Sequence, residues 1–190
     1  MDDTVAELAK CFPLRDLGPT SFLLGIEITR DWKKHTIALS QRQYIIDTLQ
    51  RFDMDTCRPV STPMEPGLRL TTDMGPKSPE DVLFMKDKPY LNAVGALMYL
   101  ALTTRPDMSY TVGVLARFSA NPGPEHWKAV KHLMRYAQGT KDLKLVYGPD
   151  ASNELFTSYT DADHGGNKDN GRSTGGCWKW SIDSLDLILV

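Results

Sequence analysis

A proline-rich stretch in the middle of the chain constrains the fold more than any other feature of the sequence. Residues 57–89 contain six of the twelve prolines in this 190-residue chain. Proline fixes φ and lacks a backbone N–H, so neither a long helix nor a central strand continues easily through such a segment. Because the stretch also has few large apolar side chains, we predict an extended linker that divides the chain into two structured parts.

The part before this linker shows the pattern of a helix, a β-hairpin and a second helix. Residues 4–12 have apolar side chains at helical spacing. Two β-favouring runs, 22–29 and 35–40, flank a polar loop and predict the hairpin, in which Gly25 marks either a close approach by a backbone or ligand or a simple bulge. Ser40 is then expected to act as the N-cap of a helix over residues 41–52.

In the part after the linker, the sequence pattern predicts three helices followed by the first strands of a sheet. The helices are expected over residues 90–103, 107–120 and 124–138, with Pro124 in a first turn and Gly139 as a C-terminal cap. In the first of them, the apolar stripe consists of Leu91, Val94, Leu97, Met98 and Ala101. Residues 143–148, 153–163 and 177–182 alternate as antiparallel strands do. The predicted architecture is mixed α and β without a single closed core.

Composition and charge narrow the class of protein. The chain is 41% hydrophobic and 24% charged, which is typical of a globular protein. It has no apolar run of the roughly 18 residues that a membrane span needs, and its acidic start is unlike a signal peptide, so we predict an intracellular location, cytoplasmic or nuclear, without secretion or membrane insertion. Three widely spaced cysteines fit neither a disulfide framework nor a zinc site.

Charge is distributed unevenly along the chain. Residues 85–144 carry a net charge of +5, between flanks of −3 and −4. Lysine and arginine release counterions when they neutralise phosphates, so a basic middle is typical of a nucleic-acid-contacting segment. An ordinary solvated helix face would show the same excess.

Several strings resemble, in the same order, the Pol polyprotein of copia-type retrotransposons, and they extend over roughly residues 5–180. They are FLLGIEI at 22–28, YLNAVGALMYL at 90–100, TRPD at 104–107, EHW at 125–127 and YTDAD at 159–163. The resemblance implies the end of a reverse transcriptase palm and the start of its thumb over 1–56, a linker over 57–89, a thumb and connection segment over 90–144 and a truncated ribonuclease H-like domain over 145–180. The tail 181–190 does not resemble the family.

The fold class implied by this resemblance is α+β. A primer-grip-like β-hairpin and thumb- or connection-like helices are followed by an incomplete, ribonuclease H-like antiparallel sheet. The resemblance also implies contacts with a nucleic-acid duplex. The hairpin at Leu24 and Gly25 looks like a primer grip, and the helix from residue 90 is similar to a thumb helix that follows a minor groove.

In that helix, Leu91, Gly95 and Tyr99 would contact the duplex, because a shallow minor groove admits a helix with small residues. Tight packing against another helix is the alternative role for Gly95. Further phosphate contacts implied by position are Lys128, Lys131 and Arg135, with Lys86, Lys88 and Arg105 as additional candidates.

Two aspartates match the region where the family binds metal. Asp161 matches the first ribonuclease H ligand, and Asp163 lies on the same strand face by the period of two. Mg²⁺ is the implied cofactor, since it prefers carboxylate oxygens and phosphoryl transfer uses paired ions. Clusters rich in Asp and Gly are also typical of plain turns. The family's later carboxylates lie downstream of this region, so we expect an incomplete site, and we reject Asp2 and Asp3 as the polymerase pair because the Asp16-Leu17-Gly18 element follows too soon.

These observations lead to one main functional hypothesis and two alternatives. The chain is expected to be a fragment of a reverse transcriptase and ribonuclease H polyprotein that contributes template-primer binding and is not catalytic by itself. Its partners would be RNA/DNA hybrid or duplex and the missing palm and ribonuclease H segments. The alternatives are a non-enzymatic nucleic-acid-binding module and a relic reading frame. No metalloprotease histidine spacing, P-loop or nucleophile elbow indicates a small-molecule substrate.

Overall fold

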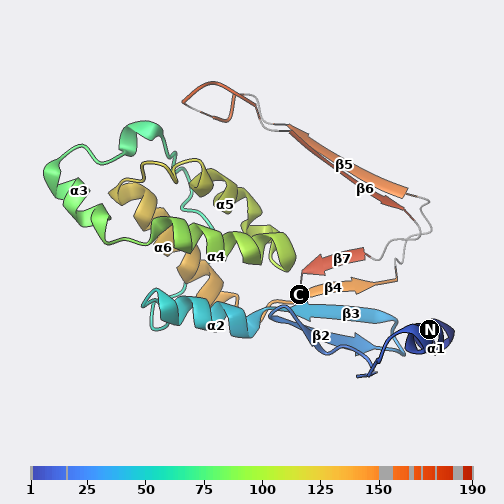
Figure 1. Ribbon diagram of the computed structural model, residues 1–190. Helices are drawn as coiled ribbons and strands as arrows, with labels where there is room; N and C mark the ends of the chain where they lie inside the picture. The colour runs from blue at the N-terminus through green and yellow to red at the C-terminus, as the bar shows by residue number, and fades with distance from the viewer. Residues whose placement is uncertain are drawn as a thin grey trace.

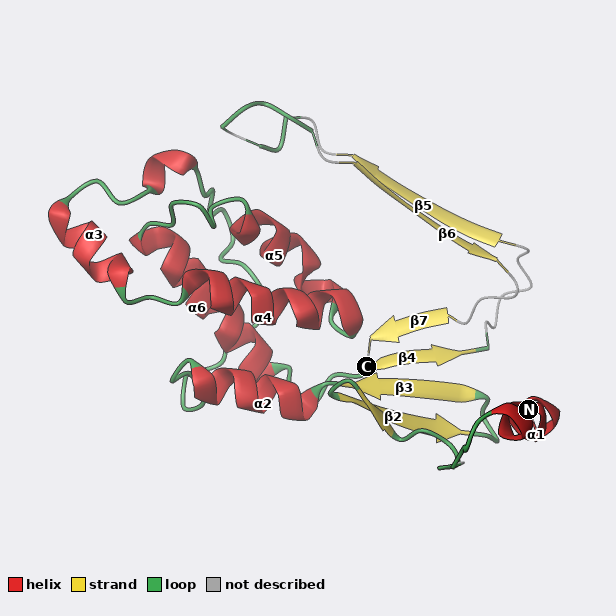
Figure 2. Cartoon of the chain, viewed as in Figure 1, coloured by secondary structure: helices red, strands yellow, loops and turns green. Residues whose placement is uncertain are grey.

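The computed structural model describes residues 2–15, 17–149, 156–162, 165–167, 169–173, 175–181 and 186–189. Within these residues the protein is of the α+β type, as expected (Figure 1). A helical body lies at one end, an antiparallel sheet lies beside it, and a two-stranded arm extends over both (Figure 2).

Five of the six described helices agree with the predicted positions, although their ends differ, whereas the third lies in the segment expected to be a linker. The six are α1 Asp2–Cys11, α2 Arg42–Arg51, α3 Pro79–Lys86, α4 Tyr90–Thr103, α5 Ser109–Ala116 and α6 Pro124–Gly139, with 3₁₀ turns η1 Thr72–Met74 and η2 Pro106–Met108. Pro124 occupies the first turn of α6, as predicted. Gly139 does not cap this helix, because the helix continues through it and Thr140 is the C-cap, with its N–H on the carbonyls of Ala137 and Tyr136.

The junction between sheet and helix also differs by one residue from the prediction. Ser40 ends a strand, and Gln41 is the N-cap of α2. The Ser40 hydroxyl still accepts a hydrogen bond from the Arg42 amide at 3.3 Å. Gln41 is buried, and its Oε1 accepts hydrogen bonds from the hydroxyls of Thr103 and Thr104 at the end of α4. The junction is therefore tied to the helical body.

The strands form two antiparallel sheets. In the larger sheet the order is β1 (Phe22–Leu23), β2 (Ile26–Asp31), β3 (Thr36–Ser40), β4 (Leu145–Gly148) and β7 (Asp186–Leu189). The smaller sheet pairs β5 (Phe156–Ala162) with β6 (Gly175–Ser181). The sequence pattern placed β4 in one sheet with β5, but β4 pairs with β3 of the hairpin instead, with Leu145 opposite Leu39. Alternation identifies a strand without identifying its partner, which here comes from 106 residues earlier in the chain.

The helical body has a single apolar core, which the sequence did not predict. Its fully buried members come mainly from α2, α4, α5 and α6 and include Ile45, Leu49, Leu97, Leu100, Leu115, Val130, Leu133 and Met134. Small residues on α4, among them Ala93 and Ala101, are buried in this core and let the helices pack closely. Leu91, which the apolar pattern assigned to the same stripe, is instead 65% exposed.

The proline-rich segment is packed structure and not the extended linker that we expected. It forms η1 and α3, buries Leu70, and places Met64, Leu68 and Met74 against the core. It lies so close to the start of α6 that a Cβ on Gly123 would meet the Met74 carbonyl oxygen at 1.9 Å. The segment is therefore a strap across the helical body, held by core packing and by hydrogen bonds from α6 to its backbone.

A capping box starts α3 within this strap. The Ser78 hydroxyl accepts from the Asp81 amide at 3.0 Å, and the Asp81 carboxylate accepts from the Ser78 amide at 3.2 Å. Hydrogen bonds from the Ser78 and Lys77 amides to the Asp81 carboxylate hold the pKa of Asp81 below its ordinary value. Pro79 at the first helical position completes a standard helix start, so a proline-rich composition here favours a short helix.

Candidate nucleic-acid interface

The predicted single strand over residues 22–29 is in fact a tight hairpin of its own. Leu23 pairs with Ile26, so only Leu24 and Gly25 form the turn, with φ of 51° and 78°. Positive φ at both central residues is typical of a type I′ turn, and glycine is favoured at the second of them. A Cβ on Gly25 would meet nothing within 4 Å, so the requirement for glycine here is conformational. Neither a bulge nor a close backbone contact explains Gly25.

A tyrosine of α4 holds this turn in place. The Tyr99 hydroxyl donates a hydrogen bond to the Leu24 carbonyl at 2.5 Å. The Tyr99 ring meets the Tyr44 ring of α2 edge to face, with centroids 5.1 Å apart. The Leu24 side chain remains 76% exposed. The turn is thus anchored through its backbone while its apolar side chain faces solvent.

The outward side of α4 continues this surface. Leu91, Gly95 and Leu102 recur at intervals of four and seven residues, which keeps them on one side of a helix. Leu91 and Leu102 are 65% and 77% exposed. A Cβ on Gly95 would meet nothing within 4 Å in the described structure, so helix packing, the alternative role, does not account for this glycine.

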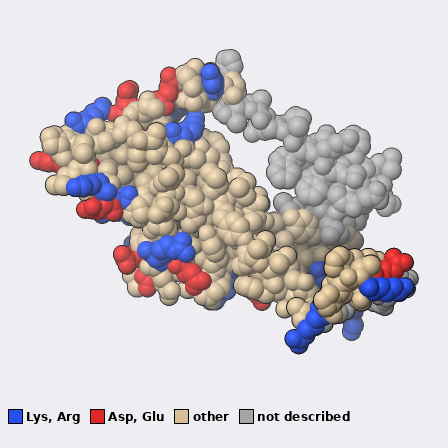
Figure 3. All heavy atoms as spheres, viewed as in Figure 1, with Lys and Arg blue, Asp and Glu red and all other residues tan. Residues whose placement is uncertain are grey.

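We call the set Leu24, Gly25, Leu91, Gly95, Tyr99 and Leu102 the hairpin–α4 surface. No residue of α4 is charged, and the area over this helix in Figure 3 is free of Lys, Arg, Asp and Glu, with charged side chains on the elements around it. Of the six members, the sequence identified all but Leu102. Its spacing from Gly95 was the available signal.

The basic residues of α6 form a separate feature. Lys128, Lys131 and Arg135 line a pocket of about 370 Å³ together with Glu65 and Glu125, and the residues that line this pocket include none from α4. Lys128 is paired with Glu125 at 2.5 Å, and Arg135 donates to the Arg58 carbonyl at 2.7 Å. The structure therefore does not join the predicted phosphate contacts to the hairpin–α4 surface in one patch.

Arg105 is not a phosphate contact, which corrects its inclusion among the candidates. Its side chain is 1% exposed and makes a two-pronged salt bridge to Asp107, at 2.7 and 3.0 Å. It also donates to the carbonyl and hydroxyl of Thr140, at 3.0 and 2.6 Å, at the end of α6. Tyr136 donates to the same Asp107 carboxylate at 2.8 Å, and burial together with this bond raises the pKa of Tyr136. The TRPD string is thus a buried brace between α4 and α6.

The EHW string is also structural. His126 is fully buried, stacks on Phe118 with centroids 4.2 Å apart, and accepts the Gly123 amide on Nδ1 at 2.9 Å. With Nδ1 as acceptor, Nε2 carries the proton and donates to the Thr71 carbonyl at 3.1 Å. Burial lowers the pKa of His126. This histidine joins the strap to α6 in its neutral form.

The side chains of the predicted metal ligands lie outside the part of the chain that the structure describes. Asp161 lies on β5 opposite Gly176, and Asp163 lies outside the described residues. Among the side chains that the structure describes, no group of three or more His, Cys, Asp or Glu is arranged to hold a metal ion. The Mg²⁺ site at Asp161 and Asp163 therefore stays a prediction, and no chemical step is derived through it.

Comparison with known proteins supplies the identity of the chain. Residues 1–66 match the family of reverse transcriptases (RNA-dependent DNA polymerases). The chain is 44% identical over 170 residues to the Retrovirus-related Pol polyprotein from transposon TNT 1-94 of Nicotiana tabacum, and 37% identical over 176 residues to that from transposon RE1 of Arabidopsis thaliana. The chain belongs to the copia-type retrotransposon Pol polyproteins. These alignments cover 90% and 93% of the chain but only 13% and 11% of the two polyproteins.

A third relative bears a different name. The Secreted RxLR effector protein 161 of Plasmopara viticola is 43% identical over 104 residues, which cover 50% of this chain and 72% of that protein. No solved structure matches the chain. None of the helices described here is long and apolar enough to cross a membrane. The copia Pol assignment thus agrees with the family resemblance in the sequence, whereas the intracellular location stays a prediction.

Proposed function

We propose that this reverse transcriptase region of a copia Pol polyprotein contributes binding of the template-primer duplex, with the hairpin–α4 surface as the contact. The observation that supports the proposal is the anchored turn. Tyr99 holds the Leu24 carbonyl beside an uncharged, exposed helix face whose central residue is a glycine with open space around it. A wide, shallow minor groove can approach such a face closely without being read for sequence.

The chemistry of this surface makes its role specific. Leucine side chains contact sugars and base edges, whereas lysine and arginine neutralise the charge of the phosphates. The hairpin–α4 surface has no cation of its own, so its share of the binding should depend little on salt. The phosphate contacts would come from Lys128, Lys131 and Arg135, or from other parts of the polyprotein. Polymerase and ribonuclease H activity, with Mg²⁺ as the cofactor, are proposed for the whole polyprotein.

Filling the open space at Gly95 tests the proposal. In the variant Gly95→Leu the helix should be as stable as in wild type or more so, since glycine costs an exposed helix about 1 kcal/mol. Its affinity for a 20-base-pair RNA/DNA hybrid should nevertheless fall at least tenfold, because the side chain keeps the groove away from α4. Gln50→Leu adds the same side chain to an exposed position of α2 and is the matched control. Equal hybrid affinity in Gly95→Leu and wild type would remove α4 from the interface.

A further inference from the structure

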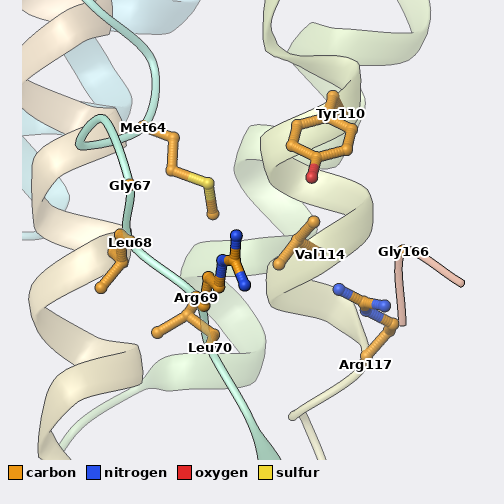
Figure 4. Close-up of a pocket in the computed structure, with 9 residues that line it drawn as sticks. All are labelled: Met64, Gly67, Leu68, Arg69, Leu70, Tyr110, Val114, Arg117 and Gly166. Atoms are coloured by element: carbon orange, nitrogen blue, oxygen red, sulfur yellow. The ribbon is translucent and has the colours of Figure 1, made fainter. Parts of the chain in front are cut away.

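A second pocket lies between the strap and α5, and its polar side chains belong neither to the hairpin–α4 surface nor to the pocket beside α6. It has a volume of about 240 Å³ (Figure 4). Its apolar walls come from Met64 and Leu68 of the strap and from Val114 of α5, and its polar groups are Arg69, Tyr110 and Arg117. Binding pockets for drug-sized ligands measure roughly 300–1,000 Å³. At about 240 Å³ this pocket is smaller than that range, so it suits a small chemical group of a few atoms together with part of an adjoining ring.

The two arginines of this pocket are not neutralised by the described part of the chain. Neither Arg69 nor Arg117 takes part in the ion pairs or side-chain hydrogen bonds found there. The guanidinium of Arg117 lies 5.8 Å from the centre of the Phe118 ring, which leaves its N–H groups available to an acceptor. Asp169, in the loop that includes the pocket residue Gly166, is engaged by the amide and hydroxyl of Thr72, both at 2.9 Å. Two forked donors thus border one small pocket without a bound carboxylate.

Tyr110 adds an aromatic surface to this pair of cations. Its side chain is 74% exposed, although an aromatic ring usually gains free energy from burial. Tyr110, Gly113 and Arg117 follow one another at intervals of three and four residues on the exposed side of α5. A Cβ on Gly113 would meet nothing within 4 Å, so the space between the ring and the guanidinium is open.

We propose that this pocket binds the phosphate group of a nucleotide, either free or within a strand, and that Tyr110 packs against the attached base or sugar. Guanidinium groups match phosphate oxygens in a two-pronged geometry, and an aromatic ring stacks on any base, so both parts of one nucleotide have a partner here. Where the phosphate belongs to a strand, the inference rests on the proposed function. The site would then hold a strand outside the hairpin–α4 surface.

Titration of the full chain with three probes tests this inference. The probes are inorganic phosphate, thymidine monophosphate and a six-nucleotide oligothymidylate, and the arginine Nε–H and backbone amide signals are followed by NMR. We expect binding that shifts the Arg69 and Arg117 signals and that weakens at least tenfold in the double variant Arg69→Gln, Arg117→Gln. Arg51→Gln, an exposed arginine of α2, is the matched control and should bind as wild type does. Arg69→Lys should weaken binding less, since it keeps the charge and loses the fork.

The comparison of probes identifies the source of the phosphate. Tighter binding of the oligonucleotide than of the monophosphate supports a strand, whereas equal binding supports a free nucleotide. In Tyr110→Ala, the affinity for the monophosphate should fall to that for inorganic phosphate; no change would overturn the role of the ring. Binding of all three probes to the double variant as tightly as to wild type, or no shift at either arginine, would overturn the site. The hybrid affinity of Gly95→Leu tests the proposed function separately.

Discussion

The turn at residues 104–107 and the turn at residues 24–25 both lie in strings typical of the family, yet they face different surroundings. In the first, Arg105 is buried and its donors are matched by Asp107 and Thr140. In the second, Leu24 is exposed and one hydrogen bond from Tyr99 anchors the backbone. Polar groups that are buried and fully paired build the fold, whereas apolar groups that are held in solvent are available to a partner. A family motif alone does not distinguish the two roles.

Removing the buried Arg105 should destabilise the fold, and we expect this to be the largest of the predicted effects. Arg105→Ala leaves the Asp107 carboxylate without its cation in a nearly buried position. Breaking such a pair costs about 3–5 kcal/mol of the free energy of unfolding. Urea denaturation followed by circular dichroism measures it, with Arg51→Ala at an exposed position of α2 as the control. A loss below about 1 kcal/mol, the range of surface ion pairs, would show that the brace is dispensable.

Replacing the glycine of the turn at residues 24–25 should lower the free energy of unfolding, by less than the loss of Arg105 does. Gly25→Ala forces a Cβ into the left-handed region at φ of 78°, which costs about 1–2 kcal/mol. Gly95→Ala introduces the same methyl group on the open face of α4 and should raise the free energy of unfolding by about 0.5–1 kcal/mol. Opposite signs in urea denaturation are the expected result. Equal destabilisation by both would mean that Gly95 is packed in solution.

Buried and exposed histidines should differ in how their protonation affects the stability of the fold, and His126 is the buried one. Its folded pKa is lowered by burial, so the unfolded state binds the proton more readily. The contribution of neutral His126 to the free energy of unfolding is therefore complete above the unfolded pKa of about 6.5, and it is lost as the pH falls below that value. In urea denaturation between pH 7.5 and 5, wild type should lose stability on acidification, and His126→Asn should lose less over that range. His35→Asn, in an exposed turn, should behave as wild type; a flat wild-type profile would contradict the prediction.

The α6 lysines should give the smallest effect. Each phosphate contact contributes about 0.9 to the slope of log affinity against log salt concentration. Lys128 is already paired with Glu125, so the double variant Lys128→Gln, Lys131→Gln should flatten the slope for an RNA/DNA hybrid by about one contact. Fluorescence anisotropy at several salt concentrations measures it, with Lys34→Gln, Lys77→Gln as the control. An unchanged slope would exclude both lysines as contacts.

The sequence predicted local elements well and their long-range pairing poorly. The helices of the body and β5 and β6 lie close to where periodicity placed them, because each signal is contained in one segment. The pairing of β4 with β3 and the packing of the proline-rich strap depend on contacts far apart in the chain, and no local pattern encodes them. The core of the helical body was missed for the same reason.

The residues of the candidate sites also divide into those that a local sequence pattern identified and those that depend on how distant segments pack. Leu24 and Gly25 were selected from one string and Tyr99 from another, and the structure joins the two strings through one hydrogen bond. Arg105 was misjudged because a basic residue in a basic segment looks like a phosphate contact until its burial is known. Arg69 and Tyr110 gave no signal, since a pocket between a strap and a helix depends on how both fold.

Amide hydrogen exchange of the chain, with and without an RNA/DNA hybrid, is the most direct test of the hairpin–α4 surface. Bound nucleic acid should slow exchange in the turn at residues 24–25 and along the segment 91–102, with smaller changes at α6. Protection confined to α6, or no protection in either segment at saturating hybrid, would contradict the assignment of this surface to duplex binding.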